Sequence, residues 1–397
     1  MKRSTHRILT THGGALVRPP ELAEMVRKRL ANQPYDERAF TSTLKRSVAE
    51  VVKEQVDTGV DVVDDGEYGK AGGWTGYVTE RLGGFRAKPG TPGSLMTIGK
   101  DREEFGEFYA DAQARGFLFP GNPPPPPGGA PQPGFGQQEC YQAVKYTGQA
   151  ILKRDIENLK AAVQGQPTEE AFYPTVAPAS LEPSHKNAYY PSQEAYVMAL
   201  GEAMAEEYRA ITNAGIVLQI DDAWIPALWE RMVNDEKSEK DFYKFAAFRM
   251  EALNNATQGI PTDRIRYHIC WGSWHGPHKY DMPMHKMLPL LLMVRAGAYL
   301  FEAANVRHEH EYKDWRNAKV PEGSILVPGV VSHATNVLEH PELVADRIIR
   351  YTNIVGRENV MAGTDCGMGN RVHRQLAFAK FESMAEGAKL ATKELWR

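Results

Sequence analysis

His268 and Cys270, in the second half of the chain, have the residue types and spacing of metal ligands. They end the run 265–270, whose β-branched and aromatic residues predict a strand. Side chains two positions apart on a strand point to the same side, so an imidazole and a thiol face a common point. This pair supplies half of a zinc site. The alternative is a buried strand whose histidine and cysteine simply pack, since free cysteine often behaves as a buried apolar residue.

The other half of such a site must come from elsewhere in the chain. Glu302 ends one strand-like run and Cys366 follows another. With His268 and Cys270 they offer one nitrogen, two sulfurs and one carboxylate, a set that suits a tetrahedral Zn²⁺ ion. The negative charges of the two thiolates and the carboxylate outweigh the positive charge of Zn²⁺. Such a zinc ion activates water weakly, and it is better suited to holding a substrate thiol as a thiolate. We therefore expect a zinc-bound sulfur to attack an electrophilic carbon.

Four other histidines are weaker candidates for ligands. They lie in loops beyond the strand ends, where a solvated or supporting role is more common than metal binding. These residues are His275, His278, His308 and His310.

Composition excludes several classes of protein. The chain has 397 residues, of which 42% are hydrophobic and 24% charged, and a net charge of −3, so it resembles an ordinary globular protein and gives no indication of nucleic acid or membrane binding. Neither the first residues nor the run 288–294 has the apolar length of a signal peptide or a membrane span. Three cysteines argue against a disulfide framework and favour a reducing, cytoplasmic setting. Cys140 lies away from any predicted strand end, and we expect it to be dispensable.

Eight strand-like runs alternate with helical stretches along the chain. The runs are continuously apolar, which is typical of parallel strands buried on both faces. This order predicts a single-domain (β/α)8 TIM barrel, an α/β fold, over residues 1–397. An open doubly wound sheet is the main rival, but no G-x-G-x-x-G follows the first run. The strand-like runs are 7–12, 60–67, 171–177, 216–221, 265–270, 298–302, 325–331 and 360–364, and the helical stretches are 20–55, 151–164, 196–214, 242–256, 283–296, 341–355 and 376–395.

A long segment, 70–144, interrupts this alternation after the second strand. It is rich in glycine and proline and contains the proline run 123–127, which fits neither helix nor central strand. We interpret it as a loop insertion on the catalytic face that covers the active site or joins copies of the chain in a homo-oligomer.

Polar residues gather where the predicted strands end. In a barrel of this type the active site lies at the carboxyl ends of the strands, and only barrel closure brings residues from so many strands together. The residues are His12, Glu67, Asp221, Asp222, His268, Cys270, Glu302, His333, Asp365 and Cys366.

At these residues the sequence resembles the cobalamin-independent methionine synthase superfamily, in its short, single-barrel form. The segments 268–278 and 328–333 are especially similar to epoxyalkane:coenzyme M transferase and its relatives. The motifs that carry the resemblance are Thr10-Thr-His-Gly-Gly, Gly66-Glu67, Gln219-Ile-Asp-Asp222, His268-x-Cys270, Glu302, Gly329-Val-Val-Ser-His333 and Gly363-Thr-Asp-Cys-Gly367.

The resemblance implies zinc-dependent alkyl transfer from a small-molecule donor to a small-molecule thiol. Glu67 and Asp221 would hold the polar end of the thiol, with His12 beside them as a further substrate-binding residue. His333 would be the acid that protonates the leaving group or the opened epoxide, and an unperturbed histidine pKa suits this task near neutrality.

Two departures from the family pattern bear on the substrates. Where the family has Gly-Ser to grip homocysteine, this chain has Gly14-Ala15, and Thr-Gly-Gln-Ala at 147–150 replaces a Gly-Pro-Val-Thr segment near the folate. Both weaken an assignment to homocysteine and methyltetrahydrofolate, but not to zinc-thiolate chemistry. The alternatives are epoxide opening by a thiol, a metal-free lyase like uroporphyrinogen decarboxylase, and a non-catalytic zinc protein. The lyase would not account for the cysteine pair, and a structural zinc site would normally be local in sequence.

Overall fold

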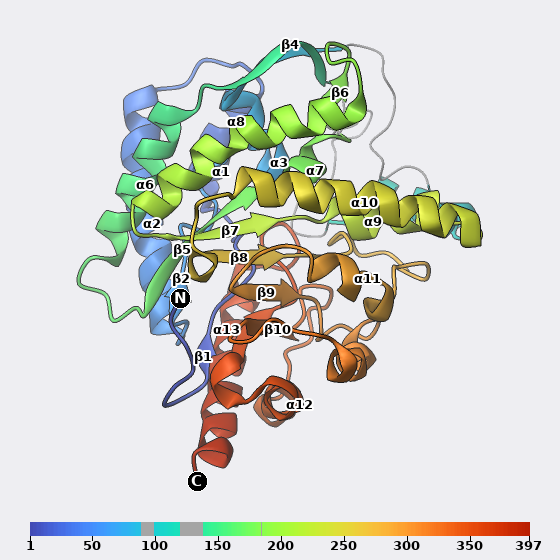
Figure 1. The fold of residues 1–397 in the computed structure, drawn as a ribbon. Coiled ribbons are helices and arrows are strands. Elements are labelled where there is room, and N and C mark those ends of the chain that lie inside the picture. The colour runs from blue at the N-terminus through green and yellow to red at the C-terminus, as the bar shows by residue number, and fades with distance from the viewer. Residues whose placement is uncertain (89–98, 120–137, 184) are drawn as a thin grey trace.

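Eight parallel strands form the centre of the molecule in a computed structural model that describes residues 1–88, 99–119, 138–183 and 185–397 (Figure 1). Their order in the sheet is β1-β11-β10-β9-β8-β7-β5-β2. The strands are β1 (Leu9–Thr10), β2 (Val62–Val63), β5 (Glu170–Val176), β7 (Val217–Asp221), β8 (Ile265–His268), β9 (Ala298–Phe301), β10 (Ile325–Val331) and β11 (Met361–Thr364).

The two edge strands of this sheet lie side by side. The Asp61 amide donates to the Thr10 carbonyl at 3.1 Å, and the Thr11 hydroxyl donates to the Val62 carbonyl at 3.0 Å. The sheet therefore nearly closes on itself, and the predicted (β/α)8 barrel is confirmed. All eight strands coincide with predicted runs; β10 matches its run at both ends, and the other seven are shorter than or shifted from theirs at one end or both.

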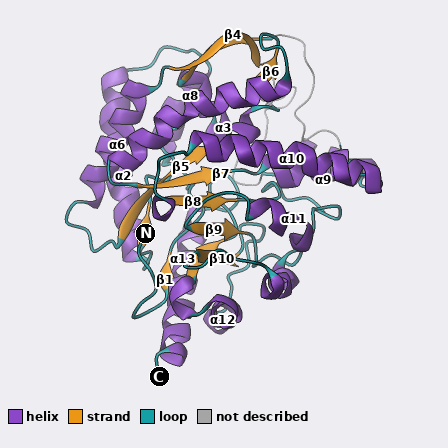
Figure 2. Ribbon diagram, viewed as in Figure 1, coloured by secondary structure: helices purple, strands orange, loops and turns teal. Residues whose placement is uncertain are grey.

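Helices surround the strands, as the purple ribbons outside the orange arrows show (Figure 2). They pack the apolar outer face of the barrel, which is why the parallel strands are buried on both sides. The main helices are α1 (Pro20–Leu30), α2 (Glu37–Asp57), α6 (Gln149–Val163), α8 (Gln193–Asn213), α9 (Trp224–Met232), α10 (Glu236–Ala256), α11 (Met284–Leu291), α12 (Pro341–Val355) and α13 (Arg374–Leu395).

The helix predicted over 20–55 is two helices. Asn32 takes a left-handed conformation with φ of 51°, which ends α1. Asp36 then caps α2, because its carboxylate accepts from the amides of Arg38 and Ala39 at 2.9 and 3.1 Å. Asn32 and Pro34 were the sequence signals for this turn.

A second, smaller sheet lies beside α8, at the top of Figure 1. It joins β3 (Leu82–Ala87) antiparallel to β4 (Gln138–Tyr146), and β4 parallel to β6 (His185–Asn187). Two helices, α4 (Lys100–Glu104) and α5 (Gly106–Arg115), also fall inside 70–144. The expectation of irregular chain was wrong for these parts, because most of the glycine and proline is concentrated between them. The proline run 123–127 lies outside the described residues, and the division into one domain with a loop insertion stays a prediction.

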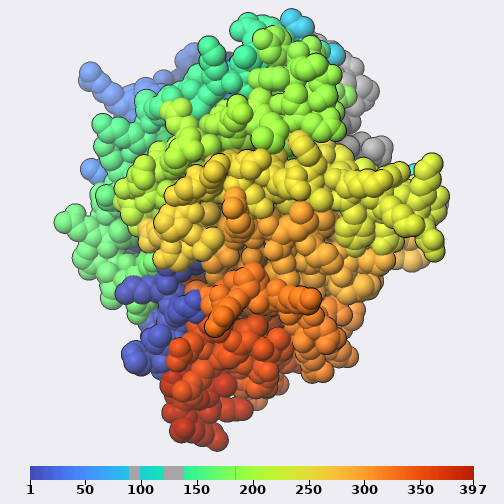
Figure 3. Space-filling view, in the orientation of Figure 1, coloured from blue at the N-terminus to red at the C-terminus, as the bar shows by residue number. Residues whose placement is uncertain are grey.

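The amino-terminal end of the barrel is filled by apolar side chains. Leu9, Phe172 and Leu300 are among the buried residues of this inner cluster, and the guanidinium of Arg266 lies 4.0 Å above the Phe172 ring. Figure 3 shows on one face how the first residues, in blue, lie against the carboxyl-terminal segment in red. Because that end is packed, a substrate site belongs at the opposite end. No helix of the described residues is long and apolar enough to cross a membrane.

Candidate metal centre and active site

Three metal-ligand side chains converge at the carboxyl ends of the strands. His268 ends β8, Cys270 follows it, and Cys366 stands two residues beyond β11. One ligand atom from each lies within 4.8 Å of the other two. Strands β8 and β11 are separated in the sheet by β9 and β10, so only the curvature of the barrel brings these residues together. We call this group the His–Cys–Cys cluster.

The orientation of His268 is fixed by its neighbour Asp221. The Nδ1 atom of His268 lies 2.9 Å from Asp221 Oδ1, which leaves Nε2 buried and without a hydrogen-bond partner among the described residues. Buried polar atoms are rarely left unpaired, and a metal-binding histidine usually gives its other nitrogen to a carboxylate in this way. The arrangement therefore fits a metal ligand.

The two sulfur atoms of the cluster interact directly. The sulfurs of Cys270 and Cys366 lie within 4.8 Å of each other, and their interaction lowers the pKa of Cys366 well below that of an ordinary thiol and raises the pKa of Cys270. His268 and His333 act on Cys366 in the same direction as this interaction. Cys366 is thus the sulfur that ionises first, and thiolate is the form that binds metals.

Glu302 lies directly after β9 and near Cys366, but its oxygens are held by the chain. Oε1 accepts from the Trp271 amide at 2.9 Å and Oε2 from the Asn305 side chain at 2.7 Å. Burial raises the pKa of Glu302 to about 8. The carboxylate forms a second close group with His333 and Asp365, and it lies outside the His–Cys–Cys cluster as defined by the 4.8 Å spacing.

His333 lies two residues beyond β10, and it is buried with Nδ1 unpartnered among the described residues. Burial lowers its pKa to about 3, so the unperturbed pKa expected from the sequence was wrong. The ring is neutral at pH 7 and offers a single N–H. Its neighbour Asp365 is held by the backbone, since its Oδ1 accepts hydrogen bonds from the Ala303 and Ala304 amides at 2.7 and 2.8 Å.

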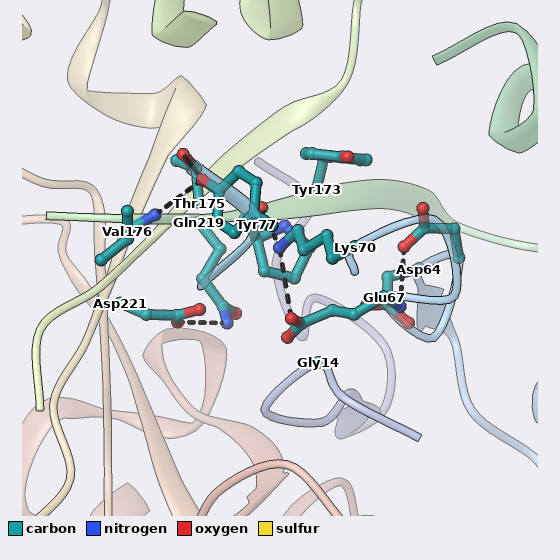
Figure 4. Close-up of polar contacts among 12 residues, drawn as sticks. Gly14, Asp64, Glu67, Lys70, Tyr77, Tyr173, Thr175, Val176, Gln219 and Asp221 are labelled. Atoms are coloured by element: carbon teal, nitrogen blue, oxygen red, sulfur yellow. Dashed lines mark hydrogen bonds and ion pairs between the residues drawn. The ribbon is translucent and has the colours of Figure 1, made fainter. Parts of the chain in front are cut away.

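Glu67 and Lys70 form a buried ion pair on the other side of the barrel mouth (Figure 4). Lys70 Nζ lies 3.3 Å from Glu67 Oε2, donates to the Pro174 carbonyl at 2.6 Å and sits over the Tyr77 and Tyr173 rings. Glu67 has a positive φ of 59°. The turn that holds this conformation is closed by the Glu67 amide, which donates to the Asp65 carboxylate at 2.9 Å. Sequence analysis missed Lys70, although it stands three residues after Glu67.

Asp221 is held beside this pair by Gln219. The Gln219 amide donates to Asp221 Oδ1 at 2.7 Å and to the Gly13 carbonyl at 3.0 Å, and Figure 4 shows Gln219 next to the Glu67–Lys70 pair. Burial raises the pKa of Glu67, and the charge of Asp221 adds to this effect. The structure therefore brings together the two carboxylates that sequence analysis assigned to the thiol.

His12 and Asp222 have partners inside the protein. His12 Nε2 lies 2.8 Å from Gln55 Oε1, and its Nδ1 accepts from the Gly14 amide at 3.2 Å. Asp222 accepts from Ser180 at 2.6 Å and Tyr267 at 3.0 Å. These contacts favour structural roles, so the substrate contact expected of His12 lacks support from the geometry and stays only a prediction.

Three of the four loop histidines considered as alternative ligands are engaged elsewhere, and the fourth, His310, is exposed. His278 and His308 share Asp281 at 3.1 and 3.0 Å, and His308 also pairs with Glu311 at 2.8 Å. His275 Nε2 contacts the His333 carbonyl at 3.2 Å. Their ring nitrogens support the loop that follows Cys270 instead of facing the sulfur atoms.

Residues 99–119 cover that loop, and we call them the cover segment. Asp101 is buried and accepts from the amides of His278 and Lys279 at 3.0 and 2.9 Å. The Tyr109 hydroxyl donates to Asp101 at 2.8 Å and accepts from the Trp274 indole at 3.1 Å. The cover segment is thus attached by buried polar contacts to the loop behind Cys270.

Arg371, which sequence analysis also missed, lies between β11 and α13. Its Nε donates to Ser273 Oγ at 2.7 Å, and its guanidinium stands 4.8 Å from the centre of the Phe119 ring. Burial lowers its pKa, and the charges of Cys366, Cys270 and Glu302 oppose that effect. Its position five residues after Cys366 was the available signal.

Comparison with known proteins identifies the family. The profile of the cobalamin-independent synthase catalytic domain matches residues 181–390, more than half of the chain. The chain belongs to this family. The matched range contains the whole His–Cys–Cys cluster, Asp221 and His333, whereas Glu67 and Lys70 precede it. The matched family is not the uroporphyrinogen decarboxylase family that sequence analysis kept as an alternative.

Individual relatives of this synthase family include enzymes of two kinds. A 2-hydroxypropyl-CoM lyase of Xanthobacter autotrophicus is 25% identical over 62% of this chain and 67% of its own. A methionine synthase of Pyrococcus horikoshii is 22% identical over 97% of this chain and 93% of its own. A solved B12-independent methionine synthase from Shewanella sp. W3-18-1 shares the fold, with a TM-score of 0.69 and 16% identity over 98% of this chain and 99% of its own.

Proposed function

We propose that this member of the cobalamin-independent synthase family is a zinc-dependent thiol alkyltransferase that passes a methyl or other alkyl group to a small thiol. The observation that carries the proposal is the His–Cys–Cys cluster, buried at the strand ends with His268 Nε2 unpartnered among the described residues. The relatives named methionine synthase and 2-hydroxypropyl-CoM lyase support it, because both names involve a sulfur compound.

The donor set fits Zn²⁺. His268, Cys270 and Cys366 would supply one nitrogen and two sulfurs, and Glu302 would complete four ligands by giving up its bond to Asn305. When bound there, zinc lowers the pKa of a substrate thiol so that it is a nucleophilic thiolate at neutral pH.

Three groups of the chain prepare the reaction. Asp221 orients the His268 ring through Nδ1. Glu67 and Asp221 form an acceptor surface that would orient hydrogen-bond donors on a substrate. The cover segment, fixed through Asp101, keeps water from the loop above the sulfur atoms, which strengthens electrostatic interactions in the site.

His333 is the group we assign to the leaving atom. A new sulfur–carbon bond forms as the bond from carbon to nitrogen or oxygen breaks, and the electron pair stays on the leaving atom. His333 is neutral at pH 7, so it acts first as an N–H donor to that developing charge. The leaving atom then takes its proton from water, while the N–H of His333 holds the developing charge.

Methyl transfer to homocysteine or a similar thiol and epoxide opening by a thiol use the same site. Two observations favour the second candidate. The lyase relative, whose name places a hydroxypropyl group on CoM, is more similar over its matched range than the methionine synthase of Pyrococcus horikoshii. Ala15 also lacks the hydroxyl that the methionine synthase pattern uses to grip homocysteine.

A screen of thiols against electrophiles on zinc-loaded protein tests the proposal. Homocysteine and 2-mercaptoethanesulfonate would each be combined with methyl donors and with short epoxides, and thioether formation measured by mass spectrometry. We expect one pair to react with wild-type protein and none with Cys366→Ser. Thioether formation at equal rates in both proteins would contradict the assignment. The free cysteines support a cytoplasmic setting, which stays part of this proposal together with a homo-oligomeric state.

A further inference from the structure

We propose that Arg371 binds an anionic group on the substrate thiol, a carboxylate or a sulfonate, and so selects anionic over neutral thiols. This inference rests on the proposed thiol alkyl transfer and adds the chemical class of its thiol. Arg371 touches none of the groups assigned so far to the transfer, and sequence analysis gave it no role.

The hydrogen-bonding capacity of Arg371 is mostly unused. A guanidinium carries five N–H donors in a plane. Nε uses one on Ser273 Oγ at 2.7 Å, and within the ranges that the structure describes the two terminal nitrogens have no hydrogen bond. Phe119 lies against the guanidinium at 4.8 Å, so the group is held in place while one edge stays open. That edge matches the two oxygens of a carboxylate or sulfonate.

The location of Arg371 points to the thiol as the carrier of the anion. Arg371 follows Cys366 by five residues, and its 2.7 Å bond to Ser273 ties it to the loop that begins at Cys270. The charges of Cys366, Cys270 and Glu302 act on its guanidinium, which agrees with this placement. A substrate sulfur that joins the His–Cys–Cys cluster leaves its short carbon tail within the same space. An anion two or three carbons from the sulfur therefore reaches the guanidinium.

Other buried cations of the barrel interior donate to the chain through their terminal nitrogens. Lys70 pairs with Glu67 and a backbone carbonyl. Arg18 donates to the carbonyls of Glu67, Tyr68 and Lys70, and Arg266 donates to Thr11 and the His12 carbonyl. Arg266 keeps one buried donor, Nε, without a partner, but among these four cations of the described chain only Arg371 has both terminal nitrogens without a hydrogen bond.

Two thiols of equal length separate charge recognition from sulfur binding. Calorimetric titration of zinc-loaded protein with 2-mercaptoethanesulfonate and with 2-mercaptoethanol measures the preference for the anion without any turnover. We expect wild-type protein to bind the sulfonate roughly 10- to 100-fold more tightly, the range of a hydrogen-bonded charge pair. Arg371→Gln should lose this preference and keep its affinity for 2-mercaptoethanol. Arg371→Lys, which retains the charge without the fork, should keep part of the preference.

The controls distinguish this inference from the function on which it rests. Zinc content and melting temperature are measured for each variant, and Arg371→Lys serves if Arg371→Gln does not fold. A sulfonate preference that survives in Arg371→Gln, or an equal loss of both thiols with zinc retained, would overturn the role of Arg371 alone. Failure of wild-type protein to bind either thiol would overturn the proposed function and this inference with it. The last experiment compares turnover with anionic and with neutral alkyl donors. If the wild-type protein prefers anionic donors and Arg371→Gln loses that preference, Arg371 binds the alkyl donor instead of the thiol, and the thiol assignment is rejected.

Discussion

The two sides of the barrel mouth are satisfied to different degrees. On the carboxylate side, near β2 and β7, Glu67 is paired with Lys70, and Asp221 with Gln219 and His268. On the sulfur side, near β8, β10 and β11, two buried histidine nitrogens lack partners within the described chain, His268 Nε2 and His333 Nδ1. The carboxylate side leaves hydrogen-bond acceptors, Gln219 Oε1 and Asp64 Oδ2, whereas the sulfur side leaves nitrogen atoms beside two thiols.

Unpaired buried polar atoms cost about 1–3 kcal/mol each, so two unpaired imidazole nitrogens beside the sulfur atoms indicate that something from outside completes that side. A metal and a leaving group are the partners that suit imidazole nitrogens. The carboxylate side is built to accept hydrogen bonds from a substrate that arrives with donors. In the proposed function the sulfur side carries the chemistry, and the carboxylate side orients the substrate.

Removing a cysteine should have the largest effect. Cys270→Ser and Cys366→Ser should each reduce bound zinc from about one ion per chain to near zero and abolish turnover, because a serine hydroxyl replaces a soft thiolate ligand. Elemental analysis with an activity assay measures both. Cys140→Ser is the matched control, since this buried cysteine belongs to β4 and the small sheet, and it should keep zinc and activity. Full zinc in both cluster variants would refute the centre.

His333→Asn should lower turnover by roughly 10²–10³-fold while zinc content and thiol affinity stay at wild-type values. The reason is that His333 acts on the leaving atom and not on the sulfur. Steady-state kinetics and calorimetry measure the two quantities separately. Unchanged turnover in a folded, zinc-loaded variant would remove His333 from the reaction.

Lys70→Met removes the Glu67–Lys70 ion pair on the carboxylate side. The change leaves the buried Glu67 carboxylate without its cation, and we expect the free energy of unfolding to fall by about 3 kcal/mol. Zinc content should not change, since Lys70 is on the other side of the mouth. Urea unfolding with zinc analysis tests this, and Lys153→Met, at an exposed lysine, is the control. Loss of zinc along with the stability would show that the two sides are not separate.

The smallest predicted effect is on the pH dependence of the free energy of unfolding. It comes from His308, which lies behind the sulfur side. Burial acts to lower the pKa of His308, but hydrogen bonds to Asp281 and Glu311 outweigh it and raise the pKa to about 10. The native state therefore holds a proton that the unfolded chain releases near pH 6.5. This stabilisation is complete below pH 6.5 and is lost as the pH rises towards 10.

The matching experiment compares unfolding free energies of wild-type protein and His308→Gln across this range. The difference should be about 2–3 kcal/mol at pH 6 and shrink steadily by pH 9–10. His285→Gln, at an exposed histidine, should give a small and nearly constant difference. A difference for His308→Gln that grows with pH would mean that the ring is neutral in the native state.

Local pattern was enough to predict part of the site. The two-residue spacing of His268 and Cys270 follows from strand geometry alone, and the eight apolar runs fixed the barrel. The barrel in turn explains how Cys366, nearly a hundred residues later, reaches the same point. These features depend on periodicity and topology, which sequence carries directly.

The rest depended on side-chain packing, which sequence does not carry. Burial, and not residue type, lowers the pKa of His333 and makes it neutral at pH 7. The partners of His12, Gln55 on α2 and Gly14 just after β1, could not be read from its position at a strand end, and its substrate contact stays a prediction. Lys70 and Arg371 were missed because their roles depend on whether neighbouring groups accept hydrogen bonds from their side-chain N–H groups, and the sequence does not show this.

X-ray absorption at the zinc edge tests the central claim most directly. For protein as purified, the account predicts two sulfur neighbours at about 2.3 Å together with nitrogen and oxygen at about 2.0–2.1 Å. Addition of the reactive thiol should raise the sulfur count from two to three, while Cys366→Ser should show no such centre. A zinc site without sulfur, or a sulfur count that stays at two under saturating thiol while the enzyme turns over, would contradict the account.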